Sequence, residues 1–467
     1  MSGAARDKAG AFAYQGVYRY LLRLIDGIEP GLRVKLPSLR ALGRTLDVSV
    51  STVQAAYALL EAEGRIEPIA KSGYYARGST AFGPALVSPD LLQQVLAGAC
   101  QSSVDVFSGA APPPRADAVK TLLRFEVELA RRYPAGLGSI VQPCGELELR
   151  HALAARYTRC LDHHWCADHV YLGADLSSVL HMTWTAMQLQ GAVVVVLVPC
   201  GWRILRTLQQ AGARVVELAL DERGRVPMQR LREVLARRQV RLMVLGASFH
   251  GPHGTCIGDA DKRTIASLLE RHGVWVAEDD TEGDLCFEAV LRFRELVAPQ
   301  RLLIFGSLQP VLGAEAPFAY LLSRHWPSRL QQYCLQRVTA APPLRHKALA
   351  RFIGSGAYDA HLNLQREALQ QQVTAFTTLL HTRLNERLQL TRSAGGACVW
   401  ARARYPVDMR GVHEDLRRQR LLIAPGDIFS LQGHCHQHLR LNGCGHSAMQ
   451  WERCAAALAV ALKVHEV

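Results

Sequence analysis

Six short apolar runs recur between residues 192 and 323, with helical patterns between most of them. The runs read AVVVVLVP, VVELAL, VRLMVLGASF, VWVAEDD, LLIFGSL and FAYLLS. Continuous, β-branched hydrophobicity of this kind is typical of parallel strands that helices cover on both faces. In such sheets functional groups gather in the turns after the carboxyl ends of the strands. These turns read PCGW, SFHGPHG, EDDTEGD and GSLQPVLGAEAP.

The composition indicates a folded chain with more than one domain. A length of 467 residues allows two or three domains, and 49% hydrophobic with 20% charged residues excludes global disorder. No apolar run reaches the roughly 18 residues that a membrane helix needs. The first residues lack the apolar segment of a signal peptide. We therefore expect a cytoplasmic protein.

The net charge of +13 comes from 47 arginines and only seven lysines. A basic chain is attracted to polyanions such as DNA. Arginine-rich composition alone gives the same charge, because arginine can occupy any solvated surface. The charge is therefore consistent with DNA binding but does not establish it.

The twelve cysteines include no C-x-x-C pair, so we expect reduced thiols. Two clusters combine cysteine with histidine: CLDHHWC at 160–166 and HCHQH at 434–438. Both offer metal ligands, but their spacing matches no standard zinc motif. We predict no metal site, and redox or metal sensing by these clusters stays open.

The first eighty residues predict a winged helix-turn-helix. An amphipathic helix at 18–28 precedes Ser38, which is placed to cap a short helix. Ser49 is placed to cap a second helix that runs to about Glu63. Two extended stretches around 70–73 then form the wing. Two short helices joined by a tight turn are typical of DNA-binding domains.

Hydroxyl groups and amides at the start of the second helix can contact phosphates. Arginines on the preceding helix and a lysine in the wing add contacts that release counterions. Residues 1–80 carry 11 basic and 7 acidic side chains. A protein-binding helical module is the alternative. The predicted DNA-binding residues are Arg40, Arg44, Ser49, Ser51, Thr52, Lys71 and Gly73.

The stretch LPSLRALGRTLDVSVSTVQAAYALLEAEGRIEPIAKSGYYARG resembles the winged helix of GntR-type transcriptional regulators. The match includes Leu36-Pro37-Ser38, Arg40, Thr52-Val53 and Tyr57. That family usually carries a base-reading arginine after the V-S of the turn, whereas this chain has Val50. The resemblance implies a double-stranded DNA operator as partner without giving its sequence.

The remaining chain resembles fold-type I aminotransferases, and the fusion resembles MocR-type regulators. The segments QPCGELELRHALAARY, LERHGVWVAEDDTEGDLCF and HLRLNGCG carry this likeness. It implies an α/β fold with a mainly parallel sheet and a smaller α+β part, in a homodimer. We expect a winged helix at 1–78, a linker at 79–105 and a body at 106–467. The large part of the body would span about 140–345, and the small part would begin at about 346.

The resemblance also implies pyridoxal phosphate, which needs a lysine amine and a carboxylate at its pyridine nitrogen. It places Asp279 at the carboxylate and Arg440 at the substrate-carboxylate arginine. The other positions of the cofactor site depart from the family. The Schiff-base lysine falls on Pro310, the phosphate arginine on Pro317, the ring-oxygen donors on Gly251 and Glu282, and the aromatic residue on Gly201, next to Trp202.

We therefore expect a regulator with no catalytic residue and no cofactor, whose body dimerises and senses a carboxylate- or amine-bearing metabolite. The expected ligand residues are Asp279, Glu282, Arg440 and Trp202. The simpler interpretation is a structural carboxylate for Asp279 and a surface ion pair for Arg440. The alternatives are non-covalent binding of pyridoxal phosphate and, least favoured, an active aminotransferase.

Overall fold

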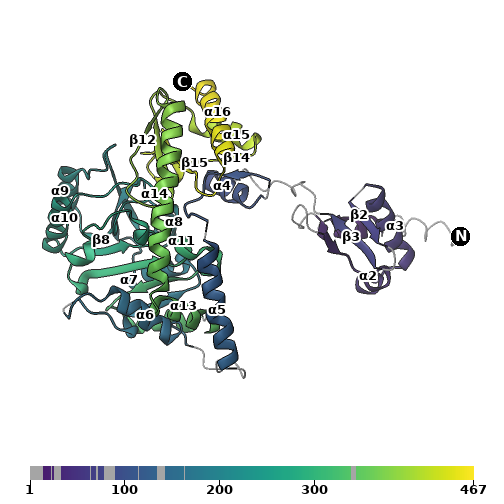
Figure 1. The fold of residues 1–467 in the computed structure, drawn as a ribbon, viewed down its shortest axis with the longest axis horizontal. Coiled ribbons are helices and arrows are strands. Elements are labelled where there is room, and N and C mark those ends of the chain that lie inside the picture. The colour runs from purple at the N-terminus through teal and green to yellow at the C-terminus, as the bar shows by residue number, and fades with distance from the viewer. Residues whose placement is uncertain are drawn as a thin grey trace. The chain divides into compact units, whose positions relative to one another are not determined.

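The computed structural model describes residues 14–22, 24–25, 33–63, 65–69, 72–77, 90–101, 103–113, 115–133, 142–161, 163–337 and 343–467. The chain forms two compact units, residues 1–103 and residues 104–467 (Figure 1). No helix in these described ranges is long and apolar enough to cross a membrane.

The amino-terminal unit is a winged helix-turn-helix, as predicted. Helices α2 (Leu39–Leu46) and α3 (Val50–Ala62) pack against an antiparallel sheet in the order β1-β3-β2. The strands are β1 (Arg33–Lys35), β2 (Ile66–Ile69) and β3 (Gly73–Arg77). Ser38 and Ser49 cap the two helices, as expected, because their hydroxyls accept hydrogen bonds from backbone amides in the first turn.

A tight turn separates α2 from α3. Asp47 ends α2 with a left-handed φ of 50°, and the Val48 amide donates to the Gly43 carbonyl at 3.0 Å. A Cβ atom at Gly43 would lie 3.0 Å from the Val48 carbonyl oxygen, so glycine permits this close return of the chain. Within the predicted linker, residues 91–99 form helix α4 (Leu91–Ala99), whereas residues 79–89 lie outside the described ranges.

The carboxy-terminal unit is built on a seven-stranded sheet in the order β5-β11-β10-β9-β8-β6-β7. All neighbouring pairs are parallel except those that β11 makes. The strands are β5 (Val170–Gly173), β6 (Val193–Val198), β7 (Arg214–Ala219), β8 (Val240–Gly246), β9 (Trp275–Asp279), β10 (Leu302–Ser307) and β11 (Ala319–Leu322).

The sheet is mainly parallel, as expected, and strand β11 is its antiparallel exception. It runs antiparallel to β10, with Phe305 opposite Leu321, and to β5. Only the short helix α11 (Gln309–Leu312) and a 3₁₀ turn (Gly313–Glu315) connect β10 to β11. A parallel return needs a crossover of about a dozen residues or more, usually through a longer helix, so the chain reverses here.

Both faces of the sheet are buried, which explains the continuous hydrophobicity of its strands. Along β6, Val195 and Leu197 enter one core, whereas Val194 and Val196 enter the other. The first core also receives side chains from α6 (Leu147–Tyr157), α9 (Met228–Arg237), α10 (Asp259–Arg271) and α13 (Pro343–Gly354). The second receives side chains from α7 (Leu176–Met187), α8 (Trp202–Gln210) and α12 (Pro327–Gln336).

The long helix α14 (Ala357–Leu384) leads from the part with α6 and α13 to a second sheet (Figure 1). This sheet has the order β12-β13-β16-β15. We call the sheet, together with strand β4 and the elements that follow α14 up to residue 467, the small subdomain. Its elements are β12 (Leu388–Leu390), β13 (Cys398–Ala403), α15 (Met409–Arg418), β14 (Leu421–Leu422), β15 (Ala424–Pro425), β16 (His438–Asn442) and α16 (Ala448–Val464).

The chain enters the carboxy-terminal unit through the small subdomain. Strand β4 (Asp105–Val106) pairs in parallel with β14. Asp105, expected at the end of the linker, is therefore part of this pairing. Helix α5 (Ala116–Arg132) follows and packs against α13.

Candidate functional site

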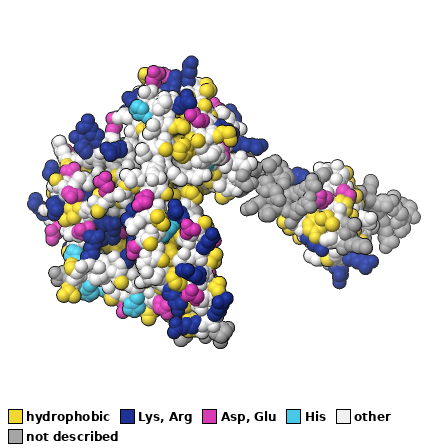
Figure 2. Space-filling model, viewed as in Figure 1, with side chains coloured by type: hydrophobic (Ala, Val, Ile, Leu, Met, Phe, Trp, Pro, Cys, Tyr) yellow, Lys and Arg dark blue, Asp and Glu magenta, His cyan; other side chains and the backbone are white. Residues whose placement is uncertain are grey.

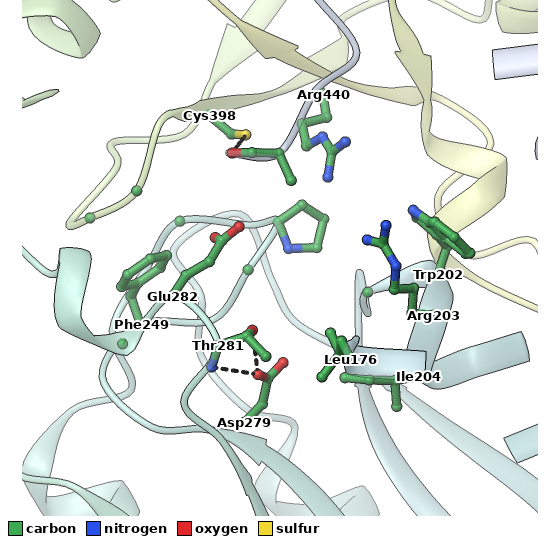
Figure 3. Close-up of a pocket in the computed structure, with 18 residues that line it drawn as sticks. Leu176, Trp202, Arg203, Ile204, Phe249, Asp279, Thr281, Glu282, Cys398 and Arg440 are labelled. Atoms are coloured by element: carbon green, nitrogen blue, oxygen red, sulfur yellow. Dashed lines mark hydrogen bonds between the residues drawn. The ribbon is translucent and has the colours of Figure 1, made fainter. Parts of the chain in front are cut away.

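A cavity of about 110 Å³ lies at the carboxyl ends of strands β6, β8 and β9. This is the edge at which the sequence placed functional turns, and the small subdomain supplies the remaining wall (Figure 3). Its lining includes Trp202, Arg203, Asp279, Thr281, Glu282 and Arg440. Three of the four expected ligand residues, Asp279, Glu282 and Arg440, point toward this space (Figure 3).

Asp279 ends strand β9 and is held by the residue two positions later. Its Oδ1 accepts hydrogen bonds from the Thr281 amide at 3.0 Å and the Thr281 hydroxyl at 2.6 Å. Burial raises the pKa of Asp279 to about 6, although these two donors oppose the shift. The interpretation of Asp279 as a structural carboxylate therefore explains the hydrogen bonds of one of its two carboxylate oxygens, Oδ1.

Glu282 occupies the position of the missing ring-oxygen donor and projects into the cavity (Figure 3). Burial raises the pKa of its carboxyl to about 7, with Asp279 adding to the shift. Arg440 and Arg203 act in the opposite direction, because a nearby positive charge favours the ionised form. No hydrogen bond joins Glu282 to either arginine within the described structure.

Arg440 is buried, with 7% of its surface exposed, so the interpretation as a surface ion pair is wrong. It lies on β16 opposite Trp400, and its guanidinium stands 4.8 Å from the centre of the Phe429 ring. One terminal nitrogen donates to the Ser108 carbonyl, whereas Nε has no hydrogen-bond partner among the described residues. A buried guanidinium with unused donors is suited to a carboxylate ligand.

Arg203 is a pocket residue that the sequence reasoning missed. It is the second residue of α8, and its guanidinium lies 4.4 Å from the centre of the Trp202 ring. Figure 3 shows Arg203 reaching toward the middle of the cavity, with Trp202 at the rim. Burial lowers the pKa of Arg203, and Arg440 adds to this shift. Its position in the turn after β6, immediately following Trp202 in the sequence, could have identified it.

The pocket does not fit covalently bound pyridoxal phosphate. The carboxy-terminal unit has four lysines, and none of them lines the cavity. Lys262 donates to the Leu291 carbonyl at 2.5 Å, and Lys347 pairs with two glutamates. Pro310 lies inside α11 and is also absent from the lining. Within the described residues, no amine is available to form an imine.

In the amino-terminal unit, the expected DNA-binding residues lie on α2, on α3 and in the wing. Arg40 and Arg44 are exposed on α2, and Ser51 is exposed in the first turn of α3. The Ser49 hydroxyl accepts from the Thr52 amide at 3.1 Å. Gly73 begins β3 with φ +115°, a conformation that favours glycine, whereas Lys71 lies outside the described residues.

The cysteine-histidine clusters do not assemble a metal site in the described ranges, where no three suitable side chains lie close enough. Cys166 and His169 are neighbours, with Sγ 3.4 Å from Nδ1. In the second cluster Cys435 is buried, and His434 Nε2 lies 4.0 Å from the Glu217 carboxylate.

Comparison with known proteins matches both units. Residues 135–458 match the family Aminotransferase class I and II, and residues 13–75 match Bacterial regulatory proteins, gntR family. The chain is 26% identical to the uncharacterized HTH-type transcriptional regulator YjiR of Escherichia coli, over 91% of this chain and 94% of that one. It is 25% identical to the uncharacterized HTH-type transcriptional regulator YdcR, also of Escherichia coli, over 92% and 93%.

The solved structure of LysN, the α-aminoadipate aminotransferase of Thermus thermophilus, matches with a TM-score of 0.71 and 19% identity. The match covers 81% of this chain and 95% of LysN, and at this identity it shows the fold alone. The chain therefore belongs to the aminotransferase class I and II family, and with its amino-terminal GntR domain it is a DNA-binding transcriptional regulator of the MocR type.

Proposed function

We propose that the carboxy-terminal body is a non-catalytic sensor that binds a small zwitterionic or amine-bearing carboxylate and thereby controls DNA binding. The observation that carries the proposal is the buried Arg440 guanidinium, which lines the cavity with its Nε unpaired among the described residues. A carboxylate ligand would supply the acceptor that this donor lacks.

The charges around the cavity favour such a ligand. Arg203 and Arg440 both lower the pKa of Glu282, so one acidic and two basic side chains line the same cavity. A ligand carboxylate would engage Arg440, and a ligand ammonium would engage Glu282. The cavity of about 110 Å³ is smaller than the roughly 300 Å³ at which pockets for drug-sized ligands begin, so we expect a small metabolite.

No lysine lines the pocket among the described residues, which supports a regulator without enzymatic activity. Non-covalent binding of pyridoxal phosphate is the second candidate, since Asp279 is retained and the Trp202 ring lies at the pocket rim. Titration of the full-length protein with pyridoxal phosphate, followed by borohydride reduction and intact mass spectrometry, distinguishes the two. We expect no covalent adduct, and a specific adduct would contradict the proposal. Saturable binding without an adduct would favour the second candidate.

The ligand itself can be sought by calorimetric titration with single amino acids, ω-amino acids and simple carboxylic acids. We expect at least one amine-bearing carboxylate to bind full-length protein, and Arg440→Ala to weaken that binding by at least tenfold. Arg232→Ala changes an exposed arginine of α9 and serves as the matched control. If Arg440→Ala leaves the binding of every such ligand unchanged, the pocket is assigned to the wrong residues.

We further propose that two copies of the body form a two-fold dimer, which would present two winged helices to paired operator half-sites. In each winged helix, the proposed operator contacts are Arg40, Arg44, Ser49, Ser51, Thr52, Lys71 and Gly73. Light scattering across a dilution series tests the dimer, and a monomer at micromolar concentration would contradict it.

A further inference from the structure

The exposed face of α3 is uncharged over its first two turns. Val53, Ala56 and Tyr57 face the core of the amino-terminal unit. The outward residues along the same stretch are Val50, Ser51, Gln54, Ala55 and Ala58, and Val50 is 44% exposed. Helix α3 contains no arginine, lysine or histidine at any position.

The hydroxyl groups at the start of α3 are largely used within the helix. Ser49 Oγ lies 2.8 Å from Ser51 Oγ and 2.7 Å from Thr52 Oγ1, in addition to accepting from the Thr52 amide. This cluster caps the helix and leaves few free donors. The side chains most available to a partner are therefore Val50, Gln54 and the two alanines.

The partner that fits this face is the major groove of duplex DNA. In a helix-turn-helix, the amino-terminal residues of the second helix contact base edges while the first helix crosses the backbone. Arg40 and Arg44 are exposed on the first helix, α2. Figure 2 shows Lys and Arg side chains at the end of the unit where α2 lies, with hydrophobic side chains beside them.

We infer that α3 selects A·T base pairs. Val50 and Ala55 offer methyl groups that complement the C5-methyl of thymine, and Gln54 can pair with N6 and N7 of adenine. The commonest specific contact to guanine is a bidentate arginine or lysine, and α3 has neither. This inference goes beyond DNA binding, because it names the base pairs that the helix reads.

The test begins with selection of bound duplexes from a random pool by the full-length protein. We expect A·T pairs at the positions shared by the selected half-sites. Each thymine in the best duplex is then replaced by deoxyuridine, which removes one methyl group. We expect at least one replacement per half-site to weaken binding by about 3- to 5-fold, since a buried methyl contributes roughly 0.8 kcal/mol.

Variants assign the effect to Val50. In Val50→Ala, the loss of affinity caused by deoxyuridine should nearly disappear. In the control Leu59→Ala, which changes an exposed residue one turn beyond the reading face, the loss should persist. Replacing adenine by 7-deazaadenine removes the N7 acceptor, and that penalty should vanish in Gln54→Ala. Circular dichroism confirms that each variant is folded.

Several outcomes would overturn the inference. These are shared G·C pairs at the selected positions, deoxyuridine tolerated at every thymine, or an undiminished penalty in Val50→Ala. If no duplex is enriched at all, specific DNA binding by this chain fails together with its base preference.

Discussion

Glu282 and Arg440 face one cavity from different subdomains, and no hydrogen bond joins them within the described structure. Arg440 lowers the pKa of Glu282, while burial raises it to a net value of about 7. The pair is therefore close enough to interact electrostatically but leaves room for a ligand. Ligand binding by Arg440 and ionisation of Glu282 each give a prediction.

The first prediction concerns Arg440. Replacing it by alanine removes the charged donors, and we expect the affinity for a carboxylate ligand to fall by at least tenfold, because hydrogen bonds to charged groups contribute about 1.5–3 kcal/mol. Isothermal titration calorimetry measures the loss. Arg440→Lys should recover only part of the affinity, since an ammonium cannot reproduce the guanidinium fork. Full recovery would show that only the charge matters.

The second prediction concerns pH. Glu282 has a folded pKa of about 7, above its ordinary value of 4.5, so its carboxyl is largely neutral at pH 6 and ionised at pH 8. An ammonium ligand should therefore bind more tightly at pH 8 than at pH 6. For the same reason, ionisation costs folding stability as pH rises from about 4.5 through 7. Glu282→Gln should abolish the pH dependence of binding and, in urea unfolding at pH 8, stabilise the body by on the order of 1–3 kcal/mol. A pH-independent wild type would rule out Glu282 as the ammonium partner.

The third prediction concerns Arg40 on the DNA side. We expect Arg40→Ala to weaken operator binding and to lower the slope of log affinity against log salt by about one, because one phosphate contact is lost. Fluorescence anisotropy over a salt series provides the measurement. Arg19→Ala, in the helical segment at 14–22, is the control. An unchanged slope in Arg40→Ala would place the phosphate contacts elsewhere.

The fourth prediction concerns the buried ions behind strand β9. Arg294 lies 2.5 Å from Asp280 and also pairs with Glu278, and all three side chains are buried. Replacing Arg294 by leucine leaves two carboxylates without their partner, so we expect a loss of about 3–5 kcal/mol in stability. Thermal unfolding monitored by circular dichroism tests this. Replacing the exposed Arg263 of α10 by leucine should have little effect.

The fifth prediction concerns Tyr57, which ties α3 to the segment before α2. Its hydroxyl donates to the Pro37 carbonyl at 2.7 Å, and burial raises its pKa to about 12. Tyr57→Phe should cost about 1–2 kcal/mol, because it leaves that carbonyl with one fewer donor. Hydrogen exchange of peptides from 39–62 should accelerate, while exchange in β9 should not change.

The local elements could be predicted from the sequence because their signals are local. Ser38 and Ser49 predict the starts of their helices because an N-cap hydrogen bond is made within the first helical turn. Asp279 could be placed because its segment resembles that of aminotransferases and ends a strand at the edge where functional turns gather, whereas Arg440 could be placed through the resemblance of HLRLNGCG alone. Neither inference needs knowledge of how distant side chains pack.

The missed features depend on packing in three dimensions. Arg203 reaches the cavity because of the direction in which the first turn of α8 leaves β6, and no periodicity encodes that direction. Strand β11 has the same hydrophobic pattern as its parallel neighbours, so only the short connection reveals its reversal. The burial of Arg440 likewise depends on Phe429 and on a carbonyl more than three hundred residues earlier in the chain.

That carbonyl belongs to Ser108, two residues after strand β4. The preceding residue, Phe107, accepts a hydrogen bond from the Asn442 amide at 2.8 Å, two positions after Arg440 on β16. The segment by which the chain enters the body is thus fastened to the strand that carries the ligand-binding arginine. A ligand carboxylate that competes with the Ser108 carbonyl for the Arg440 guanidinium would therefore act directly on the segment through which the chain enters the body.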